Sequence, residues 1–106
     1  MSLLTVTHHT ITFDRDNLNA FCYENGIKKL SLFGSILRDD FGPESDIDML
    51  VEFMPGEIVG FFRLSRIERA LSEIVGGRKV DLRTPEDLSD YFRDNVVAEA
   101  EELYVR

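Results

Sequence analysis

Apolar and polar residues alternate over positions 46–53 of the chain. Every second residue of this segment is apolar: Ile47, Met49, Val51 and Phe53. A two-residue period of this kind is typical of a β-strand with one buried face. Because side chains two positions apart on a strand point the same way, the carboxylates of Asp46 and Asp48 should share the opposite face.

Shorter runs predict two further strands, over residues 28–33 and 79–83. In the second of these, Val80 and Leu82 should face one way and Asp81 the other. Residues 1–13 alternate more loosely, which fits either an added edge strand or a flexible arm.

Apolar residues at spacings of three and four predict helices between these strands. One should begin at a cap formed by Asp14 or Asp16 and end at Asn25–Gly26. A short helix over residues 36–38 and a longer one with an apolar stripe follow, the stripe being Leu64, Ile67, Leu71 and Ile74.

The last segment predicts a long terminal helix. Thr84 and Pro85 resemble a helix start, and an apolar stripe follows, made of Phe92, Val96, Ala100 and Leu103. The chain is thus expected to be one α/β (α+β) domain over residues 1–106, with a small mixed sheet of three or more strands flanked by helices.

Composition narrows the setting and the partners. The 106 residues include 12 basic and 20 acidic side chains, a net charge of −8, which argues against stable binding to nucleic acid. Cys22 is the single cysteine, and no segment has the character of a membrane span or a signal peptide, so we expect a cytoplasmic protein. A domain this short has no room for a separate substrate-binding domain, so we expect whatever it modifies to be held partly by another molecule.

The turn Gly34-Ser35 and the acids downstream suggest nucleotide chemistry. A glycine lets a phosphate approach the backbone, and the amides after it can receive an anion. If Asp81 lies beside Asp46 and Asp48, the three carboxylates repel one another and favour a hard divalent cation such as Mg²⁺ or Mn²⁺. Each motif alone is weak evidence for nucleotide binding, since the two acids of an isolated Asp-x-Asp usually lie at a solvent-exposed edge.

Taken together, these motifs resemble the minimal nucleotidyltransferases of the DNA polymerase β-like superfamily. The resemblance rests on Gly34-Ser35, ten intervening residues, Asp46-Ile47-Asp48 and the later Asp81. Arg38 and Ser45 also match the family pattern, whereas Asp39 stands where the family usually has glycine.

The resemblance implies a catalytic role for three acids. Asp46 and Asp48 would hold two Mg²⁺ ions on ATP, and Asp81 would bind the ion that activates the attacking hydroxyl. Gly34, Ser35, Arg38 and Ser45 would form the nucleotide-binding set. Two open alternatives are an ordinary ion-pair ladder of Asp81 with Lys79 and Arg83, and a surface pairing of Arg38 with Asp39, Asp40 or Glu44.

The resemblance also implies a biological role. Family members of this size are similar to MntA-type antitoxins, whose partner is a HEPN-domain RNase toxin encoded nearby, and some transfer AMP from ATP to a toxin tyrosine. The expected function is therefore a protein adenylyltransferase. The alternatives are a non-catalytic antitoxin that acts by occlusion and, against the short length, transfer to a small molecule. A homo-oligomer is also compatible with the sequence.

Overall fold

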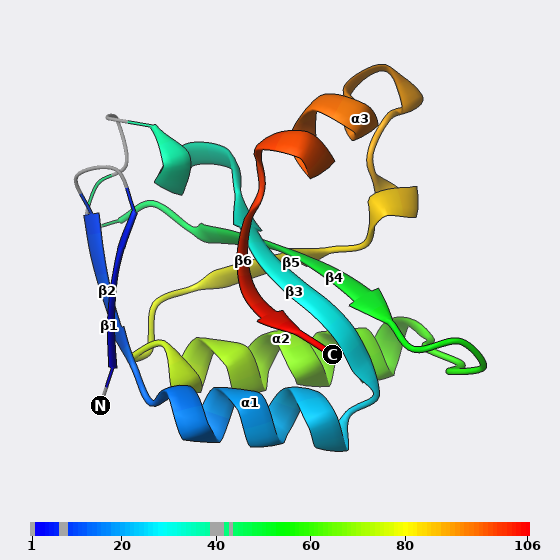
Figure 1. Cartoon of the computed structure of the whole chain (residues 1–106), viewed down its shortest axis with the longest axis horizontal. Coiled ribbons are helices and arrows are strands. Elements are labelled where there is room, and N and C mark those ends of the chain that lie inside the picture. The colour runs from blue at the N-terminus through cyan, green and yellow to red at the C-terminus, as the bar shows by residue number, and fades with distance from the viewer. Residues whose placement is uncertain (1, 7–8, 39–41, 43) are drawn as a thin grey trace.

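A four-stranded sheet with two helices on one face forms the centre of the molecule (Figure 1). The computed structural model describes residues 2–6, 9–38, 42 and 44–106, and for residues 2–12 it describes the backbone alone. The strand order is β5-β4-β3-β6, formed by Val80–Arg83, Ile47–Phe53, Ile27–Phe33 and Glu101–Val105. Strand β4 runs parallel to β5, whereas β3 is antiparallel to both β4 and β6, so the sheet is mixed as predicted.

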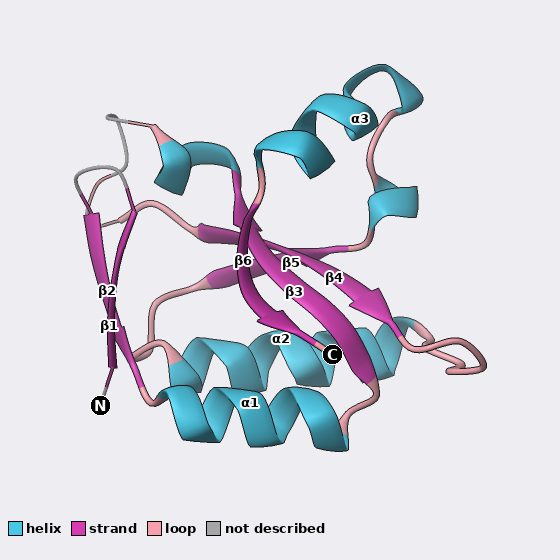
Figure 2. Cartoon of the chain, viewed as in Figure 1, coloured by secondary structure: helices cyan, strands magenta, loops and turns pink. Residues whose placement is uncertain are grey.

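Helices α1 (Arg15–Glu24) and α2 (Phe61–Ile74) cover one face of this sheet (Figure 2). Helix α1 begins at Asp14, whose carboxylate accepts a hydrogen bond from the Asn17 amide, and the predicted glycine stop at Gly26 has φ +68°. The apolar side chains of the sheet and the two helices form one core, which includes Leu18, Cys22, Leu30, Leu32, Met49, Val51, Ile67 and Leu71.

The terminal region departs from the predicted single helix. Residues Pro85–Asp87 form one 3₁₀ turn (η2), the backbone is extended at Leu88, and helix α3 (Asp90–Glu99) starts anew with Ser89 as its cap. The chain then enters β6, where Leu103 is buried as a strand residue. The predicted helical stripe through Leu103 is therefore wrong, because pairing with the open edge of β3 overrides the helical spacing.

The N-terminal segment forms its own hairpin. Strands β1 (Ser2–Val6) and β2 (His9–Phe13) pair with each other in a separate two-stranded sheet. Neither strand belongs to the central sheet, so the hairpin adds no edge strand to it. The predicted helix after Gly34 is a four-residue 3₁₀ turn, η1 (Gly34–Leu37).

Candidate functional site

Asp48 and Asp81 lie directly opposite each other on neighbouring strands. The parallel register of β4 and β5 pairs Ile47 with Val80 and Asp48 with Asp81. Ile47 and Val80 are buried in the core, and the two aspartates alternate with them, so both carboxylates lie on the sheet face turned away from α1 and α2. The predicted neighbourhood of these two acids is therefore confirmed.

The environment of Asp48 disfavours its charge. Its pKa is raised above the ordinary value first by burial and then by the negative charges of Asp81 and Asp46. A backbone hydrogen bond from Ser35 and the charge of Arg83 act in the opposite direction but do not cancel the effect. A charged Asp48 is therefore under electrostatic stress that a cation would relieve.

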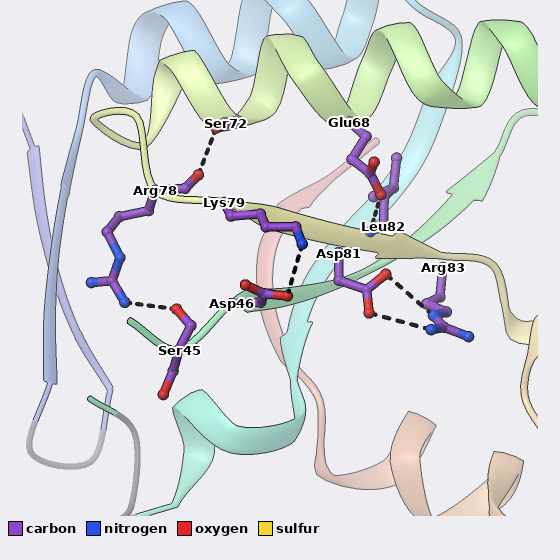
Figure 3. Close-up of polar contacts among 9 residues, drawn as sticks. All are labelled: Ser45, Asp46, Glu68, Ser72, Arg78, Lys79, Asp81, Leu82 and Arg83. Carbon is purple, nitrogen blue, oxygen red and sulfur yellow. Dashed lines mark hydrogen bonds and ion pairs between the residues drawn. The ribbon is translucent and has the colours of Figure 1, made fainter. Parts of the chain in front are cut away.

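Two basic residues of the same region pair with the other acids (Figure 3). The Lys79 ammonium lies 3.7 Å from Asp46 Oδ2, and the Arg83 guanidinium lies 3.3 Å from both Asp81 carboxylate oxygens. Of the ladder of Asp81 with Lys79 and Arg83 that was the alternative to catalysis, the pair with Arg83 is present, whereas Lys79 pairs with Asp46. Both pairs are partly exposed and so contribute little to stability.

The three acids lie near one another, but their side chains are not arranged to coordinate a metal ion. Asp46 and Asp81 each influence the pKa of Asp48, so all three share one region. Within the described ranges of the chain, however, no three His, Cys, Asp or Glu side chains converge as a ligand set. The side chains of Asp46 and Asp81 turn instead toward Lys79 and Arg83.

Gly34 lies directly against the Asp48 carboxylate. The backbone of Gly34 has φ +76°, a conformation that side chains rarely adopt. A Cβ added at this position would overlap Asp48 Oδ2 and lie 3.1 Å from Asp48 Cγ. The position thus requires glycine both for its turn and for the space that the Asp48 carboxylate fills.

The turn after Gly34 differs from the expected helix start. Its four residues are too few to build a helix dipole, and the backbone of Ser35 forms its hydrogen bond with Asp48. Phosphate binding by Ser35 stays a prediction. In this structure, the Ser35 backbone instead forms a hydrogen bond with the Asp48 carboxylate.

Ser45 and Arg38, the two remaining candidates, occupy different surroundings. Ser45 Oγ accepts a hydrogen bond from the Gly42 amide at 3.0 Å, so its hydroxyl closes the turn that leads to Asp46. Arg38 is exposed at the end of η1. Two of its suggested partners, Asp39 and Asp40, lie outside the described residues.

A pocket of about 310 Å³ opens beside Gly34. It is lined by Phe33, Gly34, Leu37, Arg38, Val96 and Glu99, and therefore lies between η1 and helix α3. The sequence reasoning missed Val96 and Glu99, because it placed Val96 in the core stripe of a long helix. In the sequence, Ser89-Asp90 is a second cap signal after Thr84-Pro85, and it would have pointed to the shorter helix.

Comparisons with known proteins bear on the family and the fold. Residues 15–103 match the model of the nucleotidyltransferase domain family. The Methanocaldococcus jannaschii protein named "Putative protein adenylyltransferase MJ0435" is 36% identical over 77 residues, which cover 73% of this chain and 80% of that protein.

Solved structures with the same fold include two informative cases. A protein described as a "putative minimal nucleotidyltransferase" is 29% identical with a TM-score of 0.65, over 81% of this chain and 85% of that one. A complex of a tri-AMPylated Shewanella oneidensis HEPN toxin with an MNT antitoxin matches at 19% identity and a TM-score of 0.60, over 87% of this chain and 70% of that one.

No helix in the described part of the chain is long and apolar enough to cross a membrane.

Proposed function

Because the chain belongs to the nucleotidyltransferase domain family, we propose that it transfers AMP from ATP to a hydroxyl group, that of a tyrosine, on a HEPN-domain toxin and thereby acts as an antitoxin. The observation that carries this proposal is the pairing of Asp48 with Asp81 across β4 and β5, with the Asp48 carboxylate seated on the Gly34 turn. Asp46, Asp48 and Asp81 are assigned as its catalytic acids.

The chemistry of the three carboxylates fits a magnesium ion. Carboxylate oxygens are the hard ligands that Mg²⁺ prefers, and the pKa of Asp48 is raised first by burial and then by the negative charges of Asp81 and Asp46. Asp46, Asp48 and Asp81 would hold the metal, and Mn²⁺ would suit the same oxygens. When bound, the metal would supply Lewis-acid stabilisation of the charge on the transferring phosphoryl group.

The residues of the chain would then orient the nucleotide. Gly34 makes room for the Asp48 carboxylate and shapes the turn, from which the Ser35 hydroxyl and the Arg38 guanidinium would donate to the triphosphate. The acceptor oxygen forms a bond to the α-phosphorus while the bond to the β-phosphate breaks. Pyrophosphate leaves, and the hydroxyl proton passes to water.

The partner assignment rests on similarity and on size. The Methanocaldococcus relative carries the name of a protein adenylyltransferase, and the Shewanella complex contains a toxin that bears AMP together with an MNT antitoxin. The described elements are the central sheet, its helices and the N-terminal hairpin, and none of them forms a separate acceptor-binding domain. An acceptor presented by a second protein, on the open face of the sheet, is therefore the economical arrangement.

Neutralisation by binding alone is the second candidate function. It is favoured by the ion pairs of Asp46 with Lys79 and of Asp81 with Arg83, which satisfy two of the three acids without a metal. A protein that only covers its partner would have no need to break these pairs.

Transfer of radiolabel separates the two candidates. The purified chain, the protein encoded by the neighbouring gene, ATP labelled at the α-phosphate and Mg²⁺ are incubated together. We expect label on the neighbouring protein, and its loss in the double variant Asp46→Asn/Asp48→Asn. Asp16→Asn/Glu24→Gln is the matched control, because it makes the same change in charge at exposed positions of α1.

Two outcomes would count against adenylyl transfer. Labelling that persists in Asp46→Asn/Asp48→Asn would show that these acids do not carry the chemistry. Full neutralisation of the partner without any label, by the parent and by the double variant alike, would establish occlusion instead.

A further inference from the structure

The backbone at Asp46 lies outside the regular sheet. Strand β4 begins one residue later, at Ile47, so Asp46 lacks a place in the ladder that fixes Asp48 and Asp81. On its C-terminal side, the Ile47 amide donates to the Lys79 carbonyl at 2.8 Å. What fixes its N-terminal side must therefore come from outside the strand.

Arg78 provides that restraint. One terminal nitrogen of its guanidinium donates to the Ser45 carbonyl at 2.8 Å and to the Gly42 carbonyl at 3.0 Å. The Ser45 carbonyl belongs to the peptide group that leads directly into Asp46 (Figure 3). The guanidinium thus binds the two ends of the short turn before the aspartate.

The turn itself is closed on both sides. The Ser45 amide donates to the Gly42 carbonyl at 3.1 Å, and the Gly42 amide donates to Ser45 Oγ at 3.0 Å. The two hydrogen bonds from Arg78 join the turn to the segment before β5. Without them, the turn would keep its internal bonds but would lose a charge-assisted link to the rest of the fold.

Arg78 is in turn anchored to helix α2. The Ser72 hydroxyl donates to the Arg78 carbonyl at 2.6 Å, and the Arg78 side chain is partly buried. The next residue, Lys79, places its ammonium 3.7 Å from the Asp46 carboxylate. Arg78 therefore contacts the backbone that leads to Asp46, and Lys79 contacts the Asp46 side chain. Both residues directly precede β5.

We propose that Arg78 is a positioning residue for Asp46, which it holds in register with Asp48 and Asp81 through the Ser45 carbonyl. This inference rests on the proposed metal-binding role of the three acids. Arg78 touches neither nucleotide nor metal in this scheme and acts only through the backbone of the turn. Outer residues that orient metal ligands commonly change metal affinity by about 10-fold to 100-fold when removed.

The test measures the affinity of the full chain for Mn²⁺ alone, by the paramagnetic resonance signal of the free ion. We expect Arg78→Met to weaken binding by about 10-fold. Arg66→Met is the matched control, because it removes the same charge from an exposed position of α2. Arg78→Lys keeps the charge and should recover part of the lost affinity.

A double-mutant cycle identifies the route of the effect. If Arg78 acts through Asp46, then adding Arg78→Met to Asp46→Asn should change Mn²⁺ affinity by less than about 2-fold. A general loosening of the fold would instead lower affinity by the same factor in both backgrounds and would overturn the inference. If Arg78→Met does not fold, Arg78→Gln is used in the same cycle.

The result also separates this inference from the proposed function. A parent protein that binds no Mn²⁺ would refute the metal site itself. A parent that binds Mn²⁺ while Arg78→Met and Arg78→Gln bind it equally well would leave the metal site standing and refute the role of Arg78.

Discussion

The two faces of strand β4 differ in what they contribute to the molecule. On the face covered by α1 and α2, Ile47, Met49 and Val51 are fully buried and belong to the core. On the other face, Asp48 is held beside Asp81 under conditions that raise its pKa. Along one strand, therefore, the apolar residues of the covered face gain free energy from burial, whereas the charge of Asp48 on the other face is disfavoured.

The substitution Asp48→Asn is the most direct test of the contrast between the two faces of β4. We expect transfer activity to fall by at least about 10³-fold, because the acid central to the site is lost. The thermal unfolding midpoint should rise, because the substitution removes a charge that burial and two neighbouring acids disfavour. Activity is measured by label transfer and the midpoint by calorimetry.

A control on the same face of β4 is Glu52→Gln, four residues from Asp48. It should change neither quantity appreciably, since surface substitutions of this kind usually lie within about 0.5 kcal/mol. A lower unfolding midpoint for Asp48→Asn would mean that the carboxylate stabilises the fold, and the contrast between the two faces would fail.

Gly34→Ala tests the support beneath Asp48. Its methyl group would overlap the Asp48 carboxylate, so the carboxylate must move and we expect activity to fall by about 10²-fold. The positive φ adds a backbone cost of about 1–2 kcal/mol. Label transfer and denaturant unfolding measure the two effects.

Gly76→Ala is the matched control for backbone strain. Gly76 has φ +80°, close to that of Gly34, but a Cβ there would meet nothing within 4 Å. It should therefore lose a similar amount of stability to strain and keep its activity. Equal activity losses in the two variants would show that the overlap with Asp48 has no consequence.

Met49→Ala probes the opposite face. Met49 is fully buried, so the loss of contacts and the cavity left behind should cost about 2–5 kcal/mol of unfolding free energy. The folded fraction should transfer AMP at nearly the parent rate, measured below the unfolding transition. A specific activity reduced as much as in Gly34→Ala would show that the two faces are coupled.

The central strands and the acid pair could be predicted because local and global preferences agree there. The alternation of β4 is set by burial on one side, and that burial also fixes which way Asp48 points. Likewise, the cap at Asp14 and the turn at Gly26 have local causes that the sequence displays.

The C-terminal region could not be predicted in the same way. The spacing of Val96, Ala100 and Leu103 fits a helix, yet Leu103 joins β6 because β3 offers an unpaired edge, and that edge is a tertiary feature. The contact of Arg78 with the Ser45 carbonyl spans 33 positions and involves a backbone oxygen. A pattern of residue types carries no signal for such a bond.

The smallest expected effect is a pH dependence of stability due to Asp48. Because its pKa is raised in the folded state, the folded protein binds the proton more tightly than the unfolded chain, and the free energy of unfolding falls as the pH rises through this titration. The fall should begin near the ordinary carboxyl value of 3.8 and end above the folded pKa. Asp48→Asn has no such group, and the other carboxylates contribute to both proteins alike. Its stability advantage over the parent should therefore grow with pH in denaturant titrations. An advantage that shrinks over this range would mean that the Ser35 hydrogen bond and Arg83 outweigh burial, and that the open face holds its charge at no cost to the fold.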